Sequence, residues 1–175
     1  MKEVKKLLLL ILILLAAVYE DYRKGIIPNK LIILGFILGI IRLIIGKEIG
    51  ELLLYLPGIL IPILLFYPIF KIGGIGGGDL KLFSMMGIYL SFWQLIYSIL
   101  LTFIIAAFLS WFQMILNHNF KQRISYLFSY IQQIIKSGTI HYYYPDTEQE
   151  EVIKKTKIRL AGPILLAVLI TGGIL

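Results

Sequence analysis

Residues 7–15 read LLLLILILL, nine apolar side chains without a polar interruption. A strand of a transmembrane β-barrel alternates polar and apolar side chains, so this run favours an α-helix. In lipid every backbone amide and carbonyl must be satisfied internally, and a helix does so within one segment. The stretch therefore predicts a helical membrane protein.

Similar runs recur along the 175-residue chain, which is 59% hydrophobic and has a mean hydropathy of +0.89. A membrane-spanning helix needs about 20 mainly apolar residues. We therefore expect an all-α bundle of about six transmembrane helices that forms one membrane-embedded domain over residues 1–175. The expected spans are 4–20, 29–46, 52–70, 80–93, 94–116 and 158–175.

Prolines mark one boundary and predict one irregular helix. Pro28 disfavours helical geometry at Ile27 and suits the first turn of the next helix. The third expected span contains three further prolines, which should bend or interrupt it unless neighbouring helices satisfy the freed carbonyls. These are Pro57, Pro62 and Pro68.

The formal net charge of +7 does not require a nucleic-acid partner, because Lys and Arg concentrate in the cytoplasmic loops of membrane proteins. With the N-terminus outside, 12 of the 17 Lys and Arg residues fall on the inner side. Lys2, Lys5 and Lys6 oppose this orientation, and with the run that follows they resemble a signal peptide. We expect an uncleaved first helix, a multi-pass protein of the plasma membrane, and the lipid bilayer as its surroundings.

Residues 117–156 form the only long polar stretch. Apolar residues at helical spacing predict an amphipathic helix there, which either lies on the inner leaflet or packs over the cytoplasmic end of the bundle. An acidic run follows and is interpreted either as a solvated face or as a surface that attracts a basic peptide. The apolar positions are Ile124, Leu127, Phe128, Ile131, Ile134 and Ile135, and the acidic ones Asp146, Glu148, Glu150 and Glu151.

The absence of cysteine excludes disulfides, thiolate metal sites and a cysteine nucleophile. His118 and His141 are 23 residues apart and lack the spacing of zinc ligands. We therefore expect neither a metal nor another cofactor.

Two aspartates stand where apolar runs meet polar connectors. Asp21 follows the first run, and Asp79 follows five glycines within positions 73–78 and precedes the fourth run. On the expected topology both reach the inner membrane face, and glycines permit turns and the close approach of a substrate backbone. Alternatively, Asp79 is a helix N-cap, Asp21 is a solvated charge and the glycines form a flexible turn.

A pair of carboxylates can hydrolyse an amide without a metal. One takes a proton from water while the other, protonated, polarises the scissile carbonyl, and the two share a proton because both cannot ionise cheaply. Amide donors at a helix N-terminus favour the anion of Asp79, so Asp21 is the expected protonated partner. A small cation transporter or channel would use the same two acids differently. A noncatalytic assembly scaffold is the third alternative.

Three segments resemble the type IV prepilin peptidase family. Asp21-Tyr22-Arg23-Lys24-Gly25-Ile26-Ile27-Pro28-Asn29 resembles its first-aspartate motif, and Gly76-Gly77-Gly78-Asp79-Leu80-Lys81-Leu82 resembles its G-x-G-D motif. Leu160-Ala161-Gly162-Pro163-Ile164 resembles the glycine-proline element of its last helix. Presenilin-like proteases share G-x-G-D but carry a Pro-Ala-Leu sequence, which this chain lacks.

The resemblance implies an aspartic endopeptidase that removes the short basic leader of prepilin-like or preflagellin-like precursors at the cytoplasmic membrane face. It implies Asp21 and Asp79 as the catalytic pair. The larger members carry a methyltransferase region with cysteine motifs that is absent here, so methyltransferase activity is not expected. A homo-oligomer is possible. Expected loop or substrate-binding residues are Gly76, Gly77, Gly78, Lys81, Glu148, Glu150 and Glu151.

Overall fold

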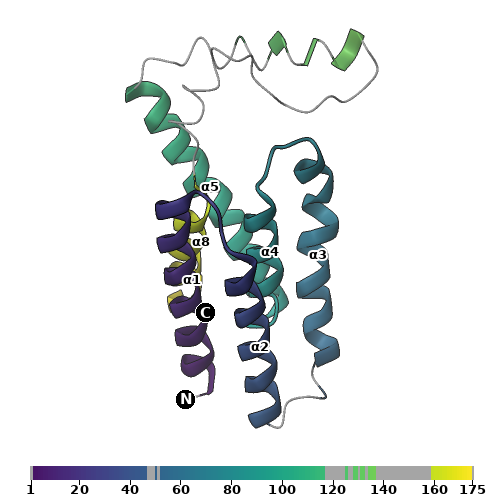
Figure 1. Cartoon of the computed structure of the whole chain (residues 1–175), viewed down its shortest axis with the longest axis vertical. Coiled ribbons are helices and arrows are strands. Elements are labelled where there is room, and N and C mark those ends of the chain that lie inside the picture. Colours follow the sequence, from purple (N-terminus) through teal and green to yellow (C-terminus); the bar gives the residue numbers. More distant parts are fainter. Residues whose placement is uncertain are drawn as a thin grey trace.

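The computed structural model describes residues 2–46, 50, 52–116 and 159–174, together with several positions between 125 and 136. All regular secondary structure in these residues is helical, as expected (Figure 1). The helices are α1 (Lys2–Lys24), α2 (Asn29–Ile45), α3 (Leu52–Lys71), α4 (Gly77–Met86), α5 (Phe92–Leu116) and α8 (Ala161–Ile174).

The helices pack in two groups that share α5, the first around α8 and the second around α4. Helix α8 contacts both α1 and α5, while α4 contacts α2, α3 and α5. Figure 1 shows the α1–α2 and α3–α4 connections at the same end of the bundle, the upper end in this view, away from the N-terminus. We call it the connector end, defined by residues 25–28 and 72–76.

Helix α4 is the buried centre of the second group. Leu82, Phe83, Met85 and Met86 are completely buried, as expected for a short helix that is packed on most of its sides. The helix ends at Met86, and turns over residues 87–90 precede α5. The expected span 80–93 is therefore wrong, because ten helical residues extend only about 15 Å and a bilayer core is about 30 Å thick.

Among the described residues, two helices are long and apolar enough to cross a membrane, namely Leu53–Lys71 and Phe92–Leu116. Ala161–Gly172 is a shorter apolar helix. Helix α2 has 17 residues, and α1 carries charged residues near both of its ends. Six transmembrane helices are thus not confirmed within the described residues.

Helix α2 approaches α4 through glycines four residues apart. A Cβ on Gly39 would lie 2.6 Å from Ile88 Cγ2, and one on Gly35 would overlap the side chain of Met85. The Tyr89 hydroxyl also donates a hydrogen bond to the carbonyl of Gly35. Small residues at this spacing let membrane helices approach closely, and here they place α4 against α2.

Helix α3 is continuous despite its three internal prolines. Pro62 cannot donate a hydrogen bond to the carbonyl of Gly58, which instead lies against the backbone of Gly87 at the end of α4. The Ser84 hydroxyl donates to the neighbouring carbonyl of Ile59 at 2.8 Å. The expected interruption is absent because α4 covers this part of α3.

The described positions between 125 and 136 are helical, and Phe128, Ile131 and Ile135 are exposed. Of the other positions of the expected amphipathic stripe, Ile134 is described, and Ile124 and Leu127 lie outside the described residues. The acidic run 146–151, with Glu148, Glu150 and Glu151, and both histidines also lie outside them.

Candidate active site at the connector end

Asp21 lies in the last turn of α1 and is 6% exposed. The helix ends because Gly25 adopts a left-handed conformation, with φ 69°, and donates its N–H to the carbonyl of Asp21 at 2.8 Å. This is the αL form of helix C-cap, for which glycine is the favoured residue. The glycine four residues after Asp21 therefore fixes where the aspartate stands.

Asp79 lies in the first turn of α4 and is partly buried. The N-cap residue is Gly76, so the alternative of Asp79 as N-cap is wrong. A Cβ on Gly76 would lie only 2.8 Å from Asp79 Oδ2, which shows that the carboxylate folds back over the start of the helix. The free amides of a first helical turn stabilise a negative charge at this place.

The first glycines after α3 end that helix. Gly73 has φ 80°, and its N–H donates to Phe70 O at 3.0 Å. The N–H of Gly74 donates to Ile69 O at 2.8 Å, which completes a Schellman motif. A side chain at Gly73 would strain this cap, so this part of the glycine run has a structural reason.

The later glycines pack against the protein itself. A Cβ on Gly78 would lie 3.0 Å from Ile27 Cβ, and one on Gly77 would lie 3.1 Å from the ring of Phe70. Gly78 therefore brings the start of α4 onto the connector that follows Asp21. Lys81 Nζ donates to Asn29 Oδ1 at 2.8 Å and joins the same two segments a second time.

The end of α1 carries Asp21, and the start of α4 carries Gly76, Gly77, Gly78, Asp79 and Lys81, so the structure brings these residues to the connector end of the bundle. The carboxylates of Asp21 and Asp79 can act as acid or base. Glu20, the residue before Asp21, forms an ion pair with Lys24 at 2.7 Å. No group of three or more potential metal ligands occurs among the described residues.

Sequence reasoning missed one residue of this region, Arg159. Its Nη1 donates to the carbonyl of Asp21 at 2.6 Å, although the two residues are 138 positions apart. The only signal was its place immediately before the glycine-proline element, and it was interpreted as one of the inner-side charges.

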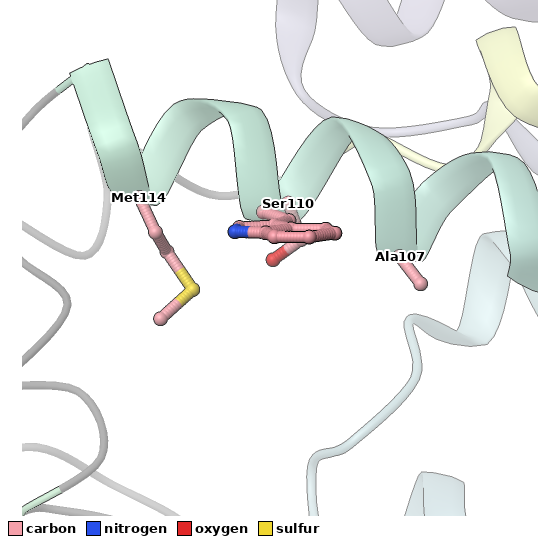
Figure 2. Close-up of a pocket in the computed structure, with 4 residues that line it drawn as sticks. Ala107, Ser110 and Met114 are labelled. Atoms are coloured by element: carbon pink, nitrogen blue, oxygen red, sulfur yellow. The ribbon is translucent and has the colours of Figure 1, made fainter.

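A shallow hollow of about 370 Å³ lies on the side of α5. Its lining consists of Ala107, Ser110, Trp111 and Met114, and Figure 2 shows Ala107, Ser110 and Met114 along the helix. No ionisable side chain lines it, so it supplies neither acid nor base. The connector end is therefore the candidate site.

Comparison with known proteins identifies the family. The model of the type IV leader peptidase family matches residues 8–111, or 104 of the 175 residues, and this stretch includes both aspartates. No curated protein and no solved structure matches the chain. The family and the two apolar helices indicate a membrane protein that acts as a peptidase. The chain belongs to the type IV leader peptidase family.

Proposed function

We propose that this peptidase is an aspartic endopeptidase which removes the short basic leader of prepilin-like or preflagellin-like precursors at the cytoplasmic face of the plasma membrane. Asp21 and Asp79 are its catalytic pair. The observation that carries the proposal is the packing of Gly78 against Ile27, because it joins the start of the Asp79 helix to the connector that follows Asp21.

The two carboxylates have different surroundings, which suits different roles. Asp21 is almost fully buried, and burial penalises a charged carboxylate. Asp79 is partly exposed in the first turn of a helix, where the backbone amides favour the anion. Asp79 is therefore assigned as the base and Asp21 as the acid.

In the reaction, Asp79 takes a proton from water as the water oxygen attacks the scissile carbonyl carbon. Protonated Asp21 donates a hydrogen bond to the carbonyl oxygen and stabilises the charge that develops there. The C–N bond then breaks, and a proton passes from the pair to the leaving amine. The two carboxylates end as they began, sharing one proton.

The other expected site residues shape the start of α4, which carries Asp79. Gly76 leaves room for the Asp79 carboxylate, and Gly77 and Gly78 allow close packing on Phe70 and Ile27. Lys81 joins this part of α4 to the start of α2 through its hydrogen bond to Asn29. Glu148, Glu150 and Glu151 of the acidic run attract the basic leader through their opposite charge.

The test is cleavage of a basic-leader precursor by purified protein in liposomes. Asp21→Asn and Asp79→Asn should each abolish the leader-sized loss of mass, because neither amide can exchange a proton as a carboxyl group does. Glu20→Gln is the matched control, since Glu20 neighbours Asp21 but is paired with Lys24. It should keep most of the activity.

An active Asp→Asn variant would contradict the catalytic pair. Cation flux through the same liposomes, with no cleavage of any precursor, would favour the transporter alternative instead. The family match favours the peptidase over that alternative.

A further inference from the structure

Arg159 connects the start of α8 to the end of α1. Its Nη1 donates a partly buried hydrogen bond of 2.6 Å to the carbonyl oxygen of Asp21. Its guanidinium carbon also lies 5.3 Å from the ring centroid of Tyr22, within the range of a cation–π contact. One side chain thus holds two consecutive residues of α1, one of which is the proposed acid.

The hydrogen bond completes the cap of α1. The Asp21 carbonyl already accepts the N–H of Gly25 at 2.8 Å, and a carbonyl oxygen has two lone pairs. The last carbonyls of a helix carry partial negative charge, which a cation stabilises. Arg159 therefore supplies the second donor and a favourable charge at the same oxygen.

The two contacts together restrict the orientation of this turn. The planar guanidinium donates in its own plane and stacks through its face, a combination that lysine cannot reproduce. Tyr22 is 67% exposed, so the rest of the protein provides little packing for its ring. The carbonyl that Arg159 holds and the carboxylate of Asp21 are joined to the same residue, so fixing one restricts the other.

Helix α8, which begins two residues after Arg159, packs on α1. Ala161, Ile164, Ala167 and Val168 of α8 are completely buried, and α8 packs against both α1 and α5. Both Arg159 and α8 lie beyond residues 8–111, the part matched by the family model.

We propose that Arg159 is a positioning residue that holds the Asp21 turn of α1 against the start of α8 and so sets the place of the Asp21 carboxylate relative to Asp79. This inference rests on the proposed catalytic pair. Arg159 touches neither the scissile bond nor the attacking water. It acts on turnover through Asp21.

The test compares Arg159→Gln and Arg159→Lys with Arg23→Gln, using the full chain in liposomes and a basic-leader precursor. Arg23 lies in the same turn, and its Nη1 donates a hydrogen bond of 3.3 Å to the Tyr19 hydroxyl, so its replacement matches the change of charge without removing the bond to Asp21. Arg159→Gln should lower kcat about 10- to 100-fold, because misplacement by about 1 Å can cost about 100-fold. KM should change by less than about threefold.

Arg159→Lys should recover part of the lost kcat, since lysine keeps the charge and one donor but not the stacked plane. Hydrogen exchange supplies a second measurement that needs no substrate. The amides of residues 22–26 should exchange faster in Arg159→Gln than in Arg23→Gln, while those of α4 should be unchanged. This also separates local loosening from global unfolding.

A normal kcat for Arg159→Gln in a protein whose cleavage requires Asp21 would overturn the inference and leave the proposed function standing. An equal loss in Arg23→Gln would overturn it too, because charge alone would then explain the effect. A wild-type chain that cleaves no precursor, or an active Asp21→Asn, would instead overturn the proposed function. The two failures are therefore distinguishable.

Discussion

Replacing Gly87 by alanine tests the closest contact between helices α3 and α4. Gly87 has φ −59° and ψ −21°, a conformation that alanine adopts without strain. An added Cβ would nevertheless lie 2.6 Å from the backbone nitrogen of Ile59 and still closer to the carbonyl group of Gly58. The change therefore isolates one steric clash from any effect of backbone conformation.

The size of the effect follows from these distances. Ordinary contact begins at 3.4 Å, so α3 and α4 must separate by at least about 0.8 Å at Ile59. Overpacking costs typically about 1–3 kcal/mol, and we expect about 2 kcal/mol because backbone atoms cannot rotate away. Helix α4 carries Asp79, so the same shift should also lower the rate of leader cleavage.

The assay is unfolding of the purified protein in mixed micelles, followed by helical circular dichroism. Gly162→Ala is the matched control, because no atom lies within 4 Å of its added Cβ. The control should be neutral or up to about 1 kcal/mol more stable, since alanine lowers the entropy of the unfolded chain. Equal stability of Gly87→Ala and the wild type would refute the close contact between α3 and α4.

Three further changes test the remaining contacts. Lys81→Gln removes the bond to Asn29 and should slow leader cleavage about tenfold, measured by mass spectrometry, with a loss of about 1 kcal/mol in the unfolding assay. Thr171→Val removes the buried 2.8 Å bond to Ser98 between α8 and α5 and should cost about 0.5–1.5 kcal/mol in that assay, with cleavage retained if the bond is only structural. Neutralising the glutamates within 148–151 should raise KM for a basic-leader precursor and weaken its salt dependence; unchanged values of both would remove the role of the acidic run.

Most helix positions could be predicted from the lengths of the apolar runs and from the proline, glycine and polar residues that separate them. The second expected span began at residue 29, as α2 does, because Pro28 ends the preceding connector. The third, 52–70, differs from α3 by one residue at its end. The glycine cap after α3 and the polar connector after α1 supply local signals that a sequence can show.

The boundary between α4 and α5 was misplaced because residues 80–116 are predominantly apolar, with few polar interruptions. A weaker local signal was present at Ser91 and Gln94, which have capping-box spacing. In the structure Gln94 Oε1 accepts the N–H of Ser91 at 3.2 Å, and Ser91 Oγ accepts the N–H of Gln94 at 3.4 Å. The end of α4, in contrast, depends on the tertiary contact of Gly87 with α3, which the sequence alone does not show.

The two aspartates and their common end of the bundle were predictable from topology, whereas the contacts that hold them were not. The motif glycines were interpreted as permitting turns and the close approach of a substrate, and the sequence did not show that a Cβ on Gly77 or Gly78 would meet Phe70 or Ile27 of the chain itself. Arg159 was counted as a topological charge because a basic residue before a helix usually is one. Only the folded chain brings it to Asp21.

The two aspartates of the proposed catalytic pair are held in place by different contacts, and Asp21 is the less constrained of the two. Asp79 stands on a helix that contacts α2, α3 and α5, so its backbone is held from several sides. Asp21 stands at the end of α1, where the Gly25 cap and the Arg159 bond both act on its own carbonyl. A catalytic geometry is only as accurate as its less constrained member. The placement of Asp21 should therefore govern turnover, and it depends on a residue and a helix that lie beyond the family-matched part of the chain.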